Sequence, residues 1–213
     1  IEDDISVSGG ELSNFAASSS TVYTATFTPT ALSTTNGVIS VASSKFSDAA
    51  GNTNADGSDS NNTLTLSVDT VRPTIAITSD ASSLKAGETT TVTFTLSESA
   101  TDFIKDDITV SGGTLGTLSG SGTTYTATFT PTDDSTTNGV ISVASDKFND
   151  SFSNANADGS DANNTVTLSV DTVRPTIAIT SDVSTLAKGE TATLTFTLSE
   201  SASDFIEGDI SVS

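Results

Sequence analysis

The sequence predicts an all-β protein made of tandem antiparallel β-sandwich modules of about 102 residues, and two observations support this. Apolar residues alternate with polar ones, mostly threonine, in short segments, and no segment shows the 3.6-residue apolar period of an amphipathic helix. Long stretches also recur at a fixed offset, since SVDTVRPTIAITSD begins at Ser67 and again at Ser169. An offset of 102 residues (169 − 67) fits a complete small domain rather than one turn of a solenoid.

The sequence DTVRP, at 69–73 and again at 171–175, marks the expected module boundaries, because proline fixes the backbone where one module hands over to the next. Residues 69–170 then form one complete module with 69–73 as its linker. Residues 1–68 are expected to be the C-terminal part of a module, and residues 171–213 the N-terminal part of the next one. Sheets divided in this way predict that the chain is a window on a longer array, with a truncated sandwich at each end.

About seven short strands are expected in the complete module, separated by turns rich in Gly, Asn, Asp and Ser. The segment TVTFTL at 91–96 places its valine, phenylalanine and leucine on one face and its threonines on the other. YTATF at 125–129 and TVTLSV at 165–170 alternate in the same way. This pattern is typical of an immunoglobulin-like sandwich that lacks the Cys and Trp of antibody domains, and its outer faces are rich in threonine.

Composition narrows the possible chemistry. The chain has 213 residues with 27 acidic and 7 basic side chains, a formal net charge of −20, and no Cys, His, Trp or Met. We expect no nucleic-acid partner and no membrane insertion, because few cations are present to neutralise phosphates and no apolar stretch is long enough to span a bilayer. Without thiol and imidazole groups, the remaining metal ligands are oxygens, which bind hard cations, chiefly Ca²⁺.

A repeated acidic loop is the first candidate calcium site. NTNADGSDSNN at 52–62 returns as NANADGSDANN at 154–164, and its first half imitates an EF-hand loop by placing oxygen-bearing side chains at alternate positions before a glycine. The twelfth position is Thr63 rather than a bidentate glutamate, so an EF-hand is excluded; an ordered, metal-free turn is the alternative to a looser calcium loop. The candidate ligands are Asp48, Asn52, Asn54, Asp56 and Asp59 in the first copy, and Asp150, Asn154, Asn156, Asp158 and Asp161 in the second.

The junction between modules is the second candidate calcium site. In a seven-strand sandwich, the loops after the second and sixth strands lie at the end where the chain enters. This places Glu98 and Asp102 near the linker residue Asp69 and near Asp150, where the carboxylates would repel one another strongly unless a cation lay between them. The equivalent candidates at the second junction are Asp171, Glu200 and Asp204, and Asp107 with its counterpart Asp209 adds a further pair.

The segments VDTVRPT, GETTTVTFTLSE and YTATFTPT together resemble the bacterial immunoglobulin-like repeats of giant RTX-type adhesins, such as biofilm-associated proteins and the extender region of ice-binding adhesins. The resemblance covers the whole chain. It implies a secreted or surface-anchored spacer that calcium makes rigid and that holds a terminal ligand-binding domain away from the cell. The expected partners are adjacent modules of the same chain and, in a fibre, neighbouring chains.

Two other functions are alternatives to a spacer. Threonine-rich faces or loop tips would bind ice, glycan or neighbouring chains in an adhesive or filament-forming module, but the two tyrosines and ten phenylalanines lie mostly at alternating core positions. Catalysis is not expected. Asp106 and Asp107 imitate the carboxylate pair of a glycoside hydrolase, yet adjacent residues on a strand point to opposite faces and cannot flank one bond.

Overall fold

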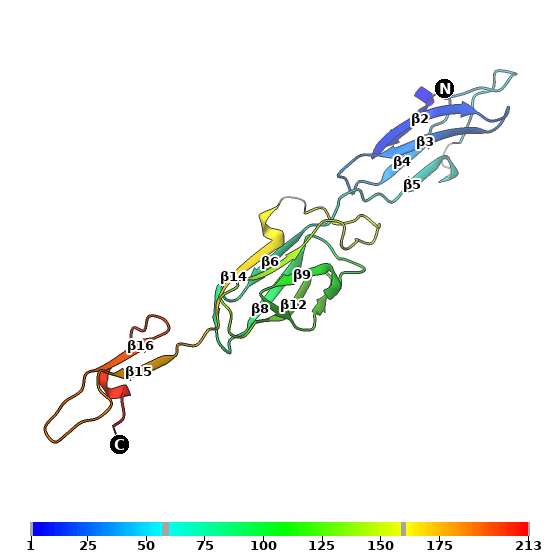
Figure 1. The fold of residues 1–213 in the computed structure, drawn as a ribbon. Coiled ribbons are helices and arrows are strands. Elements are labelled where there is room, and N and C mark those ends of the chain that lie inside the picture. Colours follow the sequence, from blue (N-terminus) through cyan, green and yellow to red (C-terminus); the bar gives the residue numbers. More distant parts are fainter. Residues whose placement is uncertain (1, 57–59, 159–160, 213) are drawn as a thin grey trace.

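The computed structural model describes residues 2–56, 60–158 and 161–212, and within these residues the protein is all-β. Three modules follow one another along an elongated chain, with the two termini at opposite ends (Figure 1). The helical segments are single 3₁₀ turns: η1 (Glu2–Asp4), η2 (Ser60–Asn62), η3 (Lys105–Asp107), η4 (Ala162–Asn164) and η5 (Glu207–Asp209).

The central module is a sandwich of two β-sheets, and its first two strands lie in different sheets. All pairs are antiparallel except β7–β14, which is parallel. One sheet has the order β10 (Gly113–Leu115), β12 (Thr124–Pro131), β8 (Thr90–Leu96), β6 (Ile75–Ser79), with β11 (Ser119–Ser121) also paired to β12. The other has the order β7 (Ser83–Lys85), β14 (Thr165–Asp171), β13 (Gly139–Val143), β9 (Ile108–Ser111).

The core of the central module follows the alternation in the sequence. In β8 the inward side chains Val92, Phe94 and Leu96 are buried, while the threonines between them face outward. Phe103 completes the core near one end, with its ring edge-on to Tyr125 and Phe148 at centroid distances of 5.1 and 5.2 Å. Burying each such phenylalanine stabilises the module by about 1.5–3 kcal/mol, so the aromatic cluster contributes much of the free energy gained by burying the core.

Both flanking modules leave part of their apolar surface uncovered. The first has one sheet of β1 (Ile5–Ser8), β4 (Gly37–Val41) and β5 (Thr63–Leu66), and one of β2 (Gly10–Ala17) and β3 (Tyr23–Pro29). The third pairs β15 (Ile177–Ser181) with β16 (Leu194–Leu198). Phe46 is 57% exposed where its counterpart Phe148 is fully buried, and Ile179 is 59% exposed where Ile77 is 5% exposed.

By its contacts, the central module ends slightly after residue 170, the boundary expected from the sequence. Strand β14 continues through Asp171, and the Thr172 hydroxyl donates to the carbonyl of Thr132 at 2.7 Å. Residues 171 and 172 therefore belong to the central module by their contacts, and Thr70 is attached to the first module in the same way.

Phe129 fills the space left by two glycines, one in each sheet of the sandwich. The ring is fully buried, and a Cβ atom added at Gly113 or Gly139 would lie 2.5 Å from the Cζ atom of Phe129. Glycine at these strand positions is therefore required by the close approach of an aromatic ring rather than by a turn.

We predict that Gly139→Ala lowers the stability of the central module by about 1–3 kcal/mol, because the new methyl group forces the Phe129 ring out of its site. Thermal unfolding followed by circular dichroism measures the change. Gly116→Ala is the matched control, since a Cβ there meets nothing closer than 3.4 Å. Equal melting temperatures for the two variants would contradict this account of the core.

Candidate calcium site at the module junction

The linker is fastened to the module that precedes it. The Thr70 amide donates to the carbonyl of Ser33 at 2.9 Å, and its hydroxyl donates to the carbonyl of Thr30 at 2.8 Å. The Ser33 amide donates back to the Thr70 hydroxyl at 2.9 Å. Thr172 makes the equivalent contacts with Thr132 and Ser135, so the two linkers begin alike.

The linker is also fastened to the module that follows it. Arg72 donates from Nε to the carbonyl of Ala155 at 2.7 Å, and its guanidinium forms an exposed ion pair with Asp146. The amide of Ala157 donates to the carbonyl of Pro73 at 3.0 Å. Both modules therefore form hydrogen bonds to a linker of only a few residues. These bonds restrict how the central module can rotate relative to the first module.

Three carboxylates meet where the linker reaches the central module. Asp69 comes from the linker, Glu98 from the β8–β9 loop (residues 97–107), and Asp150 from the β13–β14 loop (residues 144–164). One oxygen of each lies within 4.8 Å of the others; Asp150 is buried and the other two are half-buried. The structure thus brings together three of the four residues predicted at this junction.

The charges in this group act on one another. Burial raises the pKa of Glu98 above its ordinary value, and the negative charges of Asp69 and Asp150 raise it further. Both causes disfavour the ionised form of Glu98, because a carboxylate loses hydration on burial and gains like-charged neighbours. A hard cation among the three oxygens would reverse this balance by favouring ionised ligands.

Asp150 is held in place by its own loop. Its Oδ1 atom accepts hydrogen bonds from the amides of Phe152 and Asn154 at 2.8 Å, and its Oδ2 atom accepts one from Nδ2 of Asn154 at 2.7 Å. The same Nδ2 donates to the carbonyl of Asp69 at 3.1 Å. Asn154 therefore positions Asp150 and ties the loop to the linker, while a carboxylate with about four acceptor sites keeps one free.

Asp102, the fourth residue predicted at this junction, contacts a different residue. Its two carboxylate oxygens accept hydrogen bonds from the amide and Nδ2 of Asn149, at 2.7 and 2.8 Å. This contact joins the β8–β9 loop to the β13–β14 loop, the two loops that supply Glu98 and Asp150.

Asn156 and Asp158, also predicted as calcium ligands, make hydrogen bonds inside the loop in the structure. Asn156 is fully buried; its Oδ1 accepts from the amides of Lys147 and Phe148, at 2.7 and 3.1 Å, and its Nδ2 donates to the carbonyl of Ala144 and to Asp158. Asp158, 2% exposed, uses its other oxygen to accept the amide of Ile75 at 2.6 Å. Because these hydrogen bonds use the whole amide, Asn156 builds the loop and has no oxygen lone pair for a metal.

The first module repeats these contacts in its β4–β5 loop (residues 42–62). Nδ2 of Asn52 donates to Asp48 at 2.8 Å, and this bond is the main cause that lowers the pKa of Asp48. Nδ2 of Asn54 donates to Asp56 at 2.7 Å. Asp59 lies outside the described residues, and Asp161 is exposed, with its amide donating to the carbonyl of Asp158 at 2.8 Å.

The remaining candidates have local or incomplete surroundings. Asp107 accepts the amide of Ile104 at 2.8 Å, and Asp209 accepts that of Ile206 at 3.0 Å, so their recurrence is explained by closing a 3₁₀ turn. Asp171 accepts the amide of Val173 at 3.3 Å, as Asp69 accepts that of Val71 at 3.0 Å. Glu200 and Asp204 are exposed.

Sequence reasoning missed Arg72, whose side chain fixes the linker to the β13–β14 loop. The available signal was its exact place in a repeated segment, DTVRP, with Arg174 in the second copy. The proline of that segment acts locally on the backbone, which the sequence alone predicts, whereas the guanidinium contacts residues more than 70 positions away.

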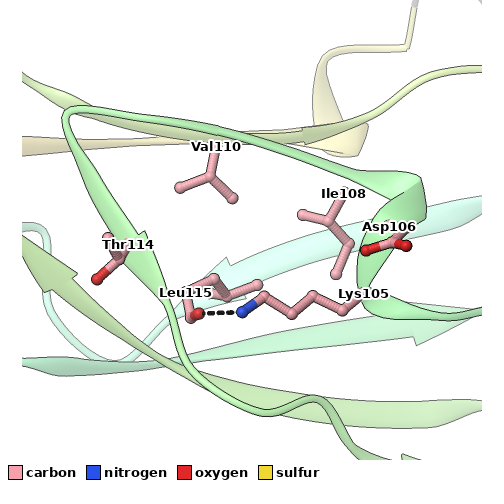
Figure 2. A pocket seen from close by; sticks show the side chains of 6 residues that line it. All are labelled: Lys105, Asp106, Ile108, Val110, Thr114 and Leu115. Carbon is pink, nitrogen blue, oxygen red and sulfur yellow. Dashed lines mark hydrogen bonds between the residues drawn. The ribbon is translucent and has the colours of Figure 1, made fainter.

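A surface cavity of about 430 Å³ lies where β9 and β10 diverge (Figure 2). Lys105 reaches across it and donates from Nζ to the carbonyl of Leu115 at 2.6 Å, with Ile108 and Val110 on the other side. Asp106 lies at its rim, while Asp107 is used in the neighbouring turn. The Lys105 side chain therefore connects the turn before β9 to β10. Asp106 and Asp107 lie in different surroundings, so they do not form the carboxylate pair of a glycoside hydrolase.

In the described part of the chain, no helix is long and apolar enough to cross a membrane. The model of the bacterial Ig-like domain family matches residues 1–65, 69–167 and 171–213, which is nearly the whole chain. The chain belongs to the bacterial Ig-like domain family. These bacterial Ig-like modules carry the same DTVRP segment at residues 69 and 171, where the second and third matches begin.

Among solved structures, the chain is similar to FdeC, an Escherichia coli adhesin, with 18% identity and a TM-score of 0.38. The similarity covers 92% of this chain and 61% of the FdeC chain, so the chain spans less than two thirds of that structure. No curated protein sequence matches the chain.

The raised pKa of Glu98 leads to a prediction for the calcium-free protein. A carboxyl group with a raised folded-state pKa contributes stability that is present below its ordinary pKa of 4.5 and lost as pH rises through the folded-state pKa. In a chelator at pH 7, Glu98→Gln should therefore melt at a higher temperature than the native protein, and the difference should vanish on acidification below the ordinary pKa. Melting curves across this pH range measure it, with Asp133→Asn as the exposed control. A lower melting temperature for Glu98→Gln at pH 7 would refute the repulsion.

Proposed function

We propose that the chain is a structural spacer from a secreted or cell-surface bacterial adhesin, in which calcium at the module junction keeps successive modules aligned. The observation that carries this proposal is the convergence of Asp69, Glu98 and Asp150 from the linker and two separate loops. Membership of the bacterial Ig-like domain family supports a structural module, and the adhesin, its surface location and the calcium are inferred from the resemblance and the site.

The donor set fits calcium better than other metals. All three side chains offer carboxylate oxygens, the chain has no Cys or His, and calcium takes six to eight oxygen ligands in flexible geometry. Water and main-chain carbonyls would complete the shell, as they do in many calcium sites. No soft-metal site can be built from these residues.

A cation at this point would act on the angle between modules. Asp69 precedes Thr70, which is fastened to the first module, whereas Glu98 and Asp150 belong to the central module. Ligands from both sides of the linker would share one ion, so bending the junction would require the ion to lose a ligand. The spacer is therefore stiff when calcium is bound and more flexible when it is removed.

The net negative charge of the central module would make the same cation important for the stability of that module. Residues 69–170 carry 4 basic and 13 acidic side chains, a net charge of −9 (4 − 13). Self-repulsion of this size destabilises a compact module, and bound cations offset it.

We predict that calcium raises the melting temperature of the protein by several degrees relative to the same sample in a chelator. A ligand that binds the native state alone adds about 2.7 kcal/mol of stability at a hundred times its dissociation constant. Differential scanning calorimetry with and without calcium measures the shift, and magnesium at the same concentration controls for general screening. An unchanged midpoint in calcium would end the calcium hypothesis.

We also predict that the double substitution of Asp69→Asn and Glu98→Gln loosens the junction while leaving the central module folded. Small-angle scattering should then show the same maximum dimension with and without calcium, whereas the native protein becomes longer and better defined in calcium. The matched control replaces Asp133 and Asp134 by asparagine, since both are exposed. A native-like calcium response in the double variant would show that the ion does not bridge the modules there.

An adhesive or filament-forming role is the second candidate function, and one observation favours it. Every acidic residue between 69 and 170 lies outside the strands, so the outer faces of both sheets are almost uncharged. On one face Thr93 of β8 lies opposite Thr126 of β12 in a regular array of threonines. Repeating the scattering measurement at rising protein concentration separates the two roles, because only this one requires chains to associate.

A further inference from the structure

The β13–β14 loop holds the incoming chain along five consecutive residues. Each residue from 154 to 158 makes a hydrogen bond to the entering segment (residues 69–75). The bonds join Asn154 Nδ2 to the Asp69 carbonyl, Arg72 Nε to the Ala155 carbonyl, Arg72 to the Asn156 carbonyl, the Ala157 amide to the Pro73 carbonyl, and the Ile75 amide to the Asp158 carboxylate.

Of these bonds, the one between the Ile75 amide and the Asp158 carboxylate is of the strongest type. The Ile75 amide approaches Oδ1 of Asp158 to 2.6 Å, and the residue that carries this carboxylate is 2% exposed. A hydrogen bond to an ionised acceptor is stronger than one between neutral groups. Since water hardly reaches Asp158, it cannot readily replace the bond when the segment is pulled.

The chain leaves the module on a strand that is held differently. Strand β14 runs parallel to β7, with Ser169, Val170 and Asp171 paired to Ser83, Leu84 and Lys85. The amide of Ser169 also donates to the carbonyl of Ser82 at 2.9 Å. β7 follows β6, the strand on which the chain enters, so two parallel strands connect the incoming and outgoing ends of the module.

This geometry determines how a pull between the two linkers is resisted. The chain enters beside the β13–β14 loop and leaves at the far end of β14, and the strands run along the length of the molecule (Figure 1). Tension on the linkers draws β7 and β14 past each other in opposite directions along their axes. The ladder bonds are then loaded together in shear, whereas a pull across a hairpin breaks them one at a time.

We propose that each module is built to carry tension along the chain, through the contact of the entering segment with residues 154–158 and through the β7–β14 pair. This goes beyond a spacer function, because it states which bonds resist a pull, and it holds with or without calcium. The ligands of the candidate calcium site are not among the residues replaced in its test.

The test is single-molecule force spectroscopy of the full chain in a chelator. The sequence contains no cysteine, so introduced cysteines are unique handles. Val71→Cys with Val173→Cys pulls on the two linkers of the central module. Thr137→Cys with Val173→Cys places both handles at the same end and peels β13 from β14, whose register pairs Gly139 with Leu168.

We expect the pull through the linkers to require a severalfold higher unfolding force than the peeling pull. Asp158→Asn should lower the force in the linker direction and leave the peeling force unchanged, while the exposed control Asp161→Asn should change neither. Equal forces in the two directions, or a linker force that Asp158→Asn leaves unchanged, would overturn the proposal. If Asp158→Asn does not fold, the comparison of the two directions with Asp158 in place still decides.

Discussion

The arrangement of the junction depends on one buried hydrogen bond, between the carboxylate of Asp158 and the amide of Ile75. It fixes the start of β6 against the β13–β14 loop, and Asn156 fixes Asp158 in turn. A buried carboxylate is costly unless its oxygens are occupied, so this pair cannot shift without leaving an unsatisfied charge in the module. Because Ile75 is fixed, Pro73, Arg72 and finally Asp69 are brought to the same loop, which is what places three carboxylates together.

Two opposing effects therefore meet at the junction. Neutral and charge-assisted hydrogen bonds hold the linker to the loop, while the acidic side chains on that linker and loop repel one another. The hydrogen-bond network forms without a cation, since Asn154 donates to Asp150 and to the Asp69 carbonyl, while Asp158 accepts from Asn156 and from the amide of Ile75. In the proposed function, calcium therefore adjusts the stiffness of a junction that the protein itself has built.

Much of the fold and part of the site could be predicted from the sequence. Alternation in segments such as 91–96 predicts which side chains are buried, because a strand has only two faces, and loop order alone brings Asp69, Glu98 and Asp150 to one end. The roles of Asp102, Asn156 and Asp107 could not be predicted, because the same oxygen atoms that bind calcium also accept backbone amides. Only the distances to particular amides separate these uses, and those depend on loop conformations that composition does not determine.

The repeated grip of Thr70 and Thr172 on the module before them has a consequence for the shape of an array. If the contacts at the end of the linker also repeat, as those of Arg72 would, each module is turned through the same angle about the long axis. A chain of identical joints is a screw, so the direction in which a given face points depends on its position along the array. Adding a module would then change both how far the far end reaches and which way it faces.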